Sequence, residues 1–143
     1  MRRVVLDTNV LVAALRSRSG ASFELISSLG GAAFEAVVSV SLVLEYESAL
    51  LRHVTATSYT EEDIRVLIDY VCDTTVHQEI FFLWRPFLRD PGDDLVLEVA
   101  VAAGCEAIVT HNVRDFAGAS HMGIRVLKPN EFLAELRRQK WVH

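Results

Sequence analysis

The sequence predicts an α/β fold in which a mainly parallel sheet is covered by helices on both faces. Short apolar segments of strand length alternate along the chain with segments of helical period, and this alternation is typical of parallel sheets. The chain has 143 residues, of which 51% are hydrophobic, so it can bury a sizeable core in one compact unit. We see no internal repeat, low-complexity segment or linker, and therefore expect a single domain over residues 1–143.

Two strands and four helices are expected in the first half of the chain. The strands are short and mainly apolar, as buried parallel strands usually are. The helices show apolar residues every three or four positions, with Ser or Thr at their starts and glycine or polar stretches at their ends. In order, the expected elements are a strand at Val4–Leu6, helices at Asn9–Arg16 and Ser22–Leu29, a strand at Phe34–Val38, a helix at Ser41–His53, and a helix that the capping-box-like Thr60–Asp63 opens and that runs to about Cys72.

The second half is expected to add two strands, two helices and one irregular segment. Asp90, Pro91 and Asp93 suit a helix start, because Asp90 can cap, proline favours the first helical position and Asp93 complements the helix dipole. The expected elements are an irregular strand or edge segment at Val76–Leu83, a helix at Asp93–Ala103 that Gly104 ends, strands at Ala107–Val109 and Ile124–Leu127, and a helix from Pro129 or Asn130 to about Lys140.

The charge balance and the cysteine content argue against several classes of protein. The formal net charge of −5 disfavours a general DNA coat or a polybasic membrane binder, although a nuclease remains compatible with it. The two cysteines, Cys72 and Cys105, provide neither a disulfide framework nor a metal-binding spacing. No stretch suits a signal-peptide core or a membrane span, so we expect a cytoplasmic location and no membrane partner.

Polar and acidic side chains recur where the predicted strands end. Because the carboxyl ends of parallel strands meet at one edge of a sheet, these side chains should lie close together. Taken one at a time, most of them could be helix caps or turn residues, and a single helix glutamate is usually solvated. The residues concerned are Asp7, Thr8 and Asn9 after the first strand, Ser39, Ser41 and Glu45 after the second, Thr110, His111, Asn112 and Asp115 after Ala107–Val109, and Asp90, Asp93 and Asp94 at the start of the preceding helix.

Such a group of carboxylates predicts a site for hard divalent cations. Carboxylates that are held close together repel one another, and some stay protonated unless cations share the space. Oxygen ligands favour Mg²⁺ or Mn²⁺ over Zn²⁺, and we expect His111 to be a loop residue rather than a ligand. A site of this kind can activate water and stabilise the charge that develops on a phosphodiester.

Three segments together resemble the PIN-domain family, above all the bacterial and archaeal branch that includes VapC-type toxins of toxin–antitoxin pairs. They are "VVLDTNVLVAAL", "SLVLEYESAL" and "DPGDDLVLEVAVAAGCEAIVTHNVRDF", and the resemblance extends from Val4 to about Leu136. It implies a three-layer α/β/α sandwich around a mainly parallel sheet. It also implies an endoribonuclease that needs Mg²⁺ or Mn²⁺ to hydrolyse phosphodiester bonds in RNA.

The resemblance also implies which residues form the site. Its four acids fall on Asp7, Glu45, Asp93 and Asp115, with Asp94 as an alternative to Asp93 one residue out of register. The polar companions are Thr8, Asn9, Thr110 and Asn112. Asn112 stands where many members have an aspartate, which leaves one charge fewer for a second metal ion.

We therefore expect Asp7 and Asp93 to anchor one Mg²⁺, with Glu45 and Asp115 completing the acidic pocket. Thr8 or Thr110 could orient the attacking water or a carboxylate, and with Asp7 as a ligand the helix-cap role would pass to Thr8 or Asn9. Three arginines are candidates for holding the RNA backbone, or are ordinary solvated side chains. They are Arg16, Arg18 and Arg114.

The resemblance further implies a small antitoxin as partner and a homodimer. The aromatic and arginine-rich segment Ile80–Pro91 is either part of the core or a groove for that partner. Two other functions are compatible with the sequence: a PIN-like RNA- or protein-binding module with weak or lost nuclease activity, and an aspartyl-phosphate phosphatase. The phosphatase is disfavoured because Asn9 stands where its mechanism needs a second aspartate.

Overall fold

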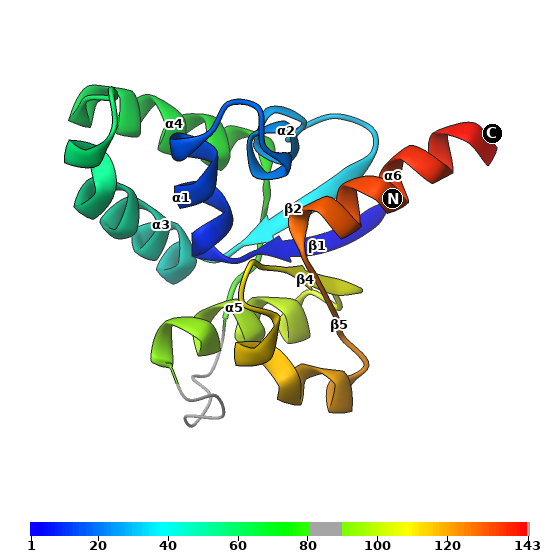
Figure 1. Cartoon of the computed structure of the whole chain (residues 1–143). Helices are drawn as coiled ribbons and strands as arrows, with labels where there is room; N and C mark the ends of the chain where they lie inside the picture. Colours follow the sequence, from blue (N-terminus) through cyan, green and yellow to red (C-terminus); the bar gives the residue numbers. More distant parts are fainter. Residues whose placement is uncertain (81–89, 143) are drawn as a thin grey trace.

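The computed structural model describes residues 1–80 and 90–142 and contains a five-stranded, entirely parallel sheet (Figure 1). The strand order is β3-β2-β1-β4-β5, so the first strand is central. The strands are β1 (Arg2–Leu6), β2 (Phe34–Val38), β3 (Val76–His77), β4 (Ala107–Val109) and β5 (Arg125–Leu127). The predicted α/β fold with a parallel sheet is therefore confirmed.

The strands agree with the prediction most closely in the centre of the sheet. β2 and β4 have the predicted bounds, whereas β1 begins two residues earlier than expected and β5 one residue later. β3 is much shorter than the predicted segment Val76–Leu83: residues 78–80 are not in a strand, and residues 81–83 lie outside the described residues. Among the described residues β3 pairs with β2 alone, because it lies at the edge of the sheet.

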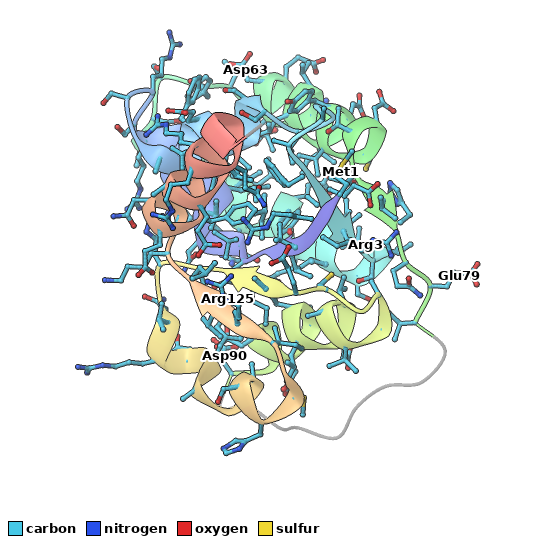
Figure 2. All side chains as sticks on the ribbon, turned by 90° about the vertical axis from the view of Figure 1, so that its right-hand side faces the viewer. Met1, Arg3, Asp63, Glu79, Asp90 and Arg125 are labelled. Carbon is cyan, nitrogen blue, oxygen red and sulfur yellow. The ribbon has the colours of Figure 1, made fainter. Side chains whose placement is uncertain are left out.

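Helices cover both faces of the sheet, as Figure 1 shows, with α5 and η2 on one face and α1, α2, α4 and α6 on the other. Side chains fill the space between the sheet and these helices (Figure 2). The helices are α1 (Thr8–Arg16), α2 (Ala21–Ser27), α3 (Val40–His53), α4 (Glu61–Thr74), α5 (Pro91–Ala102) and α6 (Pro129–Val142), with the 3₁₀ segments η1 (Val54–Ala56) and η2 (Val113–Met122). The arrangement is the α/β/α sandwich that the resemblance implied.

The expected helix starts and ends are present with small shifts. Ser39 caps α3 through a hydrogen bond from the Leu42 amide, and Thr60 and Asp63 form a reciprocal capping box at the start of α4. Asp90 caps α5 with Pro91 in its first turn, so this helix starts two residues before the predicted Asp93. Gly104 follows α5 with a φ of +63°, a conformation that side chains other than glycine rarely adopt.

The core is continuous across the sheet and holds the centre of β1 rigidly. Val4, Val5 and Leu6 are all buried, and the rings of Phe34 and Phe132 pack edge to face with their centres 5.3 Å apart. Complete burial of a Val or Leu side chain contributes about 1.5–3 kcal/mol, so β1 is a firm base for the residue that follows it. No helix in the described ranges, 1–80 and 90–142, is long and apolar enough to cross a membrane.

Candidate active site

Asp7 stands at the carboxyl end of β1, where the central strand passes directly into α1. Its backbone amide donates a 2.9 Å hydrogen bond to the Val109 carbonyl at the end of β4. Its carboxylate accepts hydrogen bonds from the Thr110 hydroxyl at 2.7 Å and from the Thr8 amide at 2.8 Å. The residue is only 6% exposed, so its carboxylate is held in one orientation by the ends of two neighbouring strands and the first helix.

Asp7 is also the cap of α1, which corrects the expectation that Thr8 or Asn9 would take that role. Asp7 has an extended backbone, with φ of −68° and ψ of 152°, and the helix begins at Thr8. Since Asp7 is the one residue between β1 and the helix, only Asp7 can occupy the cap position. Being a cap and facing the site are therefore compatible for this residue.

The backbone next to Asp7 is tied to α3 by a buried tyrosine. The Tyr46 hydroxyl donates a hydrogen bond to the Leu6 carbonyl, and the Tyr46 side chain is almost fully buried. Burial, and then the charge of Asp7, raise the pKa of Tyr46, so the hydroxyl keeps its proton as a donor. Because Glu45 precedes Tyr46 on α3, this bond also fixes where Glu45 lies relative to Asp7.

The predicted acids meet at one open cleft of about 250 Å³. Side chains from α1, α3, the start of α5 and the segment after β4 form its walls. Its lining residues are Asp7, Thr8, Asn9, Val12, Glu45, Ala49, Arg52, His53, Asp90, Gly92, Asp93, Asn112 and Asp115. The structure thus brings Asp7, Glu45, Asp93 and Asp115 together from four segments of the chain.

Of the two neighbouring aspartates on α5, Asp93 lines the cleft. Asp94 is 8% exposed and lies outside the set of lining residues. Consecutive residues of an α-helix point about 100° apart, because the helix has 3.6 residues per turn, so the two carboxylates cannot face the same space. The placement agrees with the register that the resemblance gives Asp93.

The negative charges in the cleft are not fully neutralised by neighbouring positive charges. Burial, and then the charges of Asp7, Asp90, Asp115 and Asp94, together raise the pKa of Asp93 to about 7. Burial also raises the pKa of Asp7, although the hydrogen bonds from Thr110 and Thr8 oppose that rise. A cation in the cleft would relieve both effects.

The oxygen-rich lining fits Mg²⁺ or Mn²⁺ better than a metal that needs a complete protein cage. Among residues 1–80 and 90–142, no three His, Cys, Asp or Glu side chains are close enough to hold one ion together. Mg²⁺ keeps several waters and is usually bound by one or two carboxylates with substrate phosphate oxygens. The Nδ1 atom of His53, the imidazole that lines the cleft, lies 3.2 Å from the Arg16 guanidinium, which acts as donor. The donor set therefore suits a hard cation bound by few protein ligands.

A network of neutral groups holds the wall formed by the segment after β4. Thr110 is fully buried, and its hydroxyl oxygen accepts hydrogen bonds from the Asn9 side-chain amide at 3.3 Å and the Asn112 backbone amide at 3.0 Å while it donates to Asp7. The side-chain oxygen of Asn9 accepts from the His111 amide at 3.2 Å. These bonds join α1 to the segment after β4, so Thr110 and Asn9 position the acids that line the cleft.

Asp115 has a different local structure from the one expected. A turn with Asp115 as the cap of a short helix was an alternative, but Asn112 precedes η2 and Asp115 lies in its first turn. His111 is a loop residue, as expected, and its Nε2 atom lies 2.8 Å from the Ser22 hydroxyl on α2. Burial, and then the charge of Lys128, lower the pKa of His111.

The three candidate arginines occupy different places. Arg16 bonds to His53 at the rim of the cleft, whereas Arg18 points to Tyr59, with 3.3 Å between its Nε and the Tyr59 hydroxyl. Arg114 lines a neighbouring pocket. The groove expected in the segment Ile80–Pro91 lies largely outside the described residues.

Sequence reasoning missed Arg52 and His53 as lining residues of the cleft. It expected Asp90 at this edge of the sheet but did not include it among the site residues, yet like Asp7 it caps a helix and lines the cleft. Arg52 lies 3.7 Å from the Glu45 carboxylate, and a spacing of seven residues puts both on one face of α3. That spacing is the signal that could have identified Arg52.

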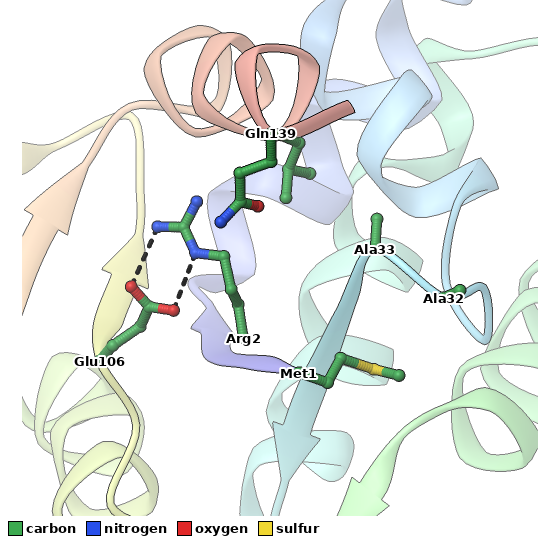
Figure 3. A pocket seen from close by; sticks show the side chains of 7 residues that line it. Met1, Arg2, Ala32, Ala33, Glu106 and Gln139 are labelled. Carbon is green, nitrogen blue, oxygen red and sulfur yellow. Dashed lines mark hydrogen bonds and ion pairs between the residues drawn. The ribbon is translucent and has the colours of Figure 1, made fainter. Parts of the chain in front are cut away.

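A larger pocket lies at the opposite edge of the sheet, near the amino ends of β1 and β2 (Figure 3). Its volume is about 550 Å³, and its one lining arginine, Arg2, is bound to Glu106 through two hydrogen bonds of 2.8 and 2.9 Å and to Glu135 through one of 2.7 Å. The pocket lacks the acidic and polar cluster that the strand carboxyl ends provide. Its paired charges indicate a structural role.

Comparisons with known proteins agree with this geometry. A family model of the PIN domain matches residues 3–114. The chain is also similar to a chain in the crystal structure of VapBC2 from Rickettsia felis bound to a DNA fragment from their promoter, with a TM-score of 0.58 and 17% sequence identity, covering 88% of this chain and 98% of that chain. At this level of identity the likeness shows the fold. No curated protein matches the chain.

Proposed function

Because the chain belongs to the PIN-domain family, we propose that it is an endoribonuclease that depends on Mg²⁺ or Mn²⁺ and hydrolyses RNA phosphodiester bonds. The observation that carries this proposal is the convergence of Asp7, Glu45, Asp93 and Asp115 on one cleft at the carboxyl ends of the strands. The raised pKa of Asp93, about 7, supports it because a cleft with excess negative charge favours a cation.

Asp7 and Asp93 are the proposed ligands of one ion, with Glu45 and Asp115 completing the acidic surroundings. Asp7 is the best-held member, since Thr110 and Thr8 fix both of its carboxylate oxygens. When bound, Mg²⁺ supplies Lewis-acid chemistry, which lowers the pKa of water and neutralises charge on the phosphate.

The protein's own groups would position the reactants and move the proton. Glu45 or Asp115 accepts a proton from the attacking water, whose oxygen then bonds to phosphorus as the leaving oxygen departs. Thr110 orients the Asp7 carboxylate, because its hydroxyl proton is committed to that bond. Arg16 and Arg52, at the rim on the α1 and α3 side, are candidates for contacts with the RNA backbone.

The direct experiment measures RNA cleavage by the purified protein with Mg²⁺ or Mn²⁺, and again with a chelator. We expect cleavage only with the metal, and loss of cleavage in the isosteric variants Asp7→Asn and Asp93→Asn. Circular dichroism would show that both variants stay folded. Cleavage that persists in the chelator or in both folded variants contradicts the proposal.

We extend the proposal to a toxin of a toxin–antitoxin pair, a homodimeric cytoplasmic protein with one domain over residues 1–143 and a small antitoxin as partner. The fold it shares with a chain of the VapBC2 structure supports this extension. Co-expression with the product of the adjacent reading frame should yield a complex that loses RNase activity. A protein that stays free and active in that co-expression contradicts the partner assignment.

A binding module with lost nuclease activity is the second candidate function. It is favoured by Asn112, a neutral side chain in the lining of the cleft where many members of the family have an aspartate. Calorimetric titration with Mn²⁺ separates the two candidates. A nuclease should bind Mn²⁺ and lose that binding in Asp7→Asn, whereas a module with a decayed site should bind no Mn²⁺ in either form.

A further inference from the structure

A second pocket adjoins the acidic cleft at the carboxyl ends of β4 and β5. Its volume is about 610 Å³, and its lining residues are His111, Asn112, Val113, Arg114, Asp115 and Lys128. Asn112 and Asp115 line both spaces, so the pocket and the cleft adjoin at these two residues. A strand that crosses these two residues reaches both spaces.

Lys128 occupies the same position after β5 that Asp7 occupies after β1. The Thr110 amide donates a 2.9 Å hydrogen bond to the carbonyl of Leu127, which places Lys128 beside the segment that follows β4. From β1 through β4 to β5, the residues after the strands change from an acid, Asp7, through the neutral Thr110, to a cation, Lys128. The edge of the sheet therefore carries adjoining acidic and basic sections.

The two cations of this pocket differ in their surroundings from six arginines elsewhere in the described residues. Arg114 and Lys128 are both exposed, and in the part of the chain that the structure describes neither has a carboxylate within salt-bridge distance. By contrast, six arginines are paired with glutamates: Arg2, Arg3, Arg52, Arg65, Arg125 and Arg137. The positive charge of Arg114 and Lys128 is thus available to a ligand.

The pocket has a fixed wall against which such a ligand can lie. His111 is held at its ring by the Ser22 hydroxyl at 2.8 Å and at its backbone amide by Asn9 at 3.2 Å. The backbone of Asn112 is held by Thr110 at 3.0 Å. These bonds come from α1, from α2 and from the residue that follows β4, so the segment between the cleft and the pocket is anchored at three places.

We propose that Arg114 and Lys128 form a phosphate subsite that holds the backbone of single-stranded RNA beside the phosphate to be cleaved. This inference rests on the proposed function, because it takes the acidic cleft as the place of cleavage. Phosphate contacts from Arg and Lys position a strand without reading its sequence. An RNA strand suits both spaces, since its phosphates meet cations in the basic pocket and a metal ion in the cleft.

The experiment measures binding of a fluorescent single-stranded RNA oligonucleotide to the full chain in Mg²⁺, with Asp93→Asn as the uncleaving parent. Arg114→Ala and Lys128→Ala are each added to this parent, and Arg65→Ala on α4 is the matched control because it removes the same charge far from the pocket. We expect several-fold weaker binding for each pocket variant. For each lost phosphate contact, the slope of log affinity against log salt should shrink by about 0.7.

Several outcomes would overturn the subsite. They are absence of RNA binding by the parent at low salt, affinities of the pocket variants equal to that of the parent, and an equal loss in Arg65→Ala. The competing ligand class is an acidic peptide, with polyglutamate as the probe. If the pocket variants lose affinity for polyglutamate but keep their affinity for RNA, the proposal is contradicted.

Failure of the proposed function gives a different pattern. If the wild-type chain cleaves RNA with metal and the pocket variants bind RNA as the parent does, only the subsite proposal is contradicted. If the pocket variants bind RNA more weakly but the wild-type chain cleaves no RNA with any metal, the nuclease proposal is contradicted. The two cations would then still bind RNA phosphates.

Discussion

The Thr110 hydroxyl donates a 2.7 Å hydrogen bond to the Asp7 carboxylate, and this bond joins the carboxyl ends of β4 and β1 inside the protein. Thr110 has no exposed surface, so the bond acts on Asp7 from the core side. It leaves the other side of the carboxylate free to face the cleft that Asp7 lines.

Replacing Thr110 tests this support. Thr110→Val keeps the shape of the side chain but removes the donor, so the buried Asp7 carboxylate loses a partner. We expect the free energy of unfolding to fall by about 1–3 kcal/mol and RNA cleavage to fall with it. Urea denaturation and a cleavage assay measure the two effects. Thr110→Ser keeps the hydroxyl and should retain most of the activity; equal losses in both variants would mean that packing, and not the bond, matters.

Tyr46 offers a second test, because its hydroxyl bonds the Leu6 carbonyl next to Asp7. Tyr46→Phe should cost about 1 kcal/mol of stability and reduce cleavage, since the end of β1 loses its tie to α3. The matched control is Tyr70→Phe, which removes a 2.7 Å bond from a tyrosine hydroxyl to the Ile26 carbonyl away from the cleft. We expect that variant to lose similar stability and to keep its activity. Equal activity losses in the two would contradict a local effect.

The positions of Asp7 and Asp115 could be predicted because parallel strands direct their carboxyl ends to one edge of the sheet. The position of Asp93 could be predicted because the helix that leads into β4 begins at that same edge. The cap of α1 was mispredicted because a cap and a cleft residue were treated as exclusive, whereas the direct passage from β1 into α1 makes Asp7 both. The η2 segment was not predicted, because the glycine and the serine among its ten residues are typical of turns. Tyr46 could not be identified, since its partner is a backbone carbonyl that no sequence pattern marks.

Asp93 predicts how stability depends on pH without metal. Its pKa in the folded protein is about 7, above the ordinary value of 3.8, so the folded state binds the proton more tightly than the unfolded state. The stability contribution of this proton is full below about 3.8 and is lost as pH rises through about 7. Thermal melts in chelator should therefore show a less stable protein at pH 8 than at pH 5.5, and Mg²⁺ should restore stability at pH 8.

Asp93→Asn should weaken this dependence and raise the melting temperature at pH 8 in chelator, while cleavage is lost. A variant that is more stable but inactive would show that the charge of Asp93 destabilises the fold and serves the reaction. A structural carboxylate would instead stabilise the fold. If the variant melts lower than the wild type at pH 8 without metal, the account of repulsion in the cleft is wrong.

Glu135 has the opposite dependence on pH at the other edge of the sheet. It accepts hydrogen bonds from Arg125 at 2.6 Å and Arg2 at 2.7 Å, which lower its pKa from 4.5 to about 2. The stability from these bonds is present above about 4.5 and is lost as pH falls through about 2.

Glu135→Gln should therefore cost about 1–2 kcal/mol at pH 7, and much less near pH 2. Cleavage at pH 7 should be unchanged, because Glu135 lies far from the cleft. Glu62→Gln, in the exposed pair with Arg65, is the control and should have little effect at any pH. A cost that does not change with pH would contradict the ionic explanation.

Asn112 lines both the acidic cleft and the basic pocket. Its neutral amide therefore lies between the proposed metal site and the proposed RNA subsite. Asn112→Asp adds a carboxylate where both spaces meet. We expect Mn²⁺ binding by calorimetry to become tighter or to gain a second site, because another hard oxygen ligand is present. RNA affinity should fall at the same time, since the new charge opposes Arg114 and Lys128. Asn112→Asp should therefore raise the affinity for Mn²⁺ and lower the affinity for RNA. Asn112→Ala adds no charge and should cause neither of these changes. Tighter RNA binding by Asn112→Asp would contradict the basic character assigned to the pocket.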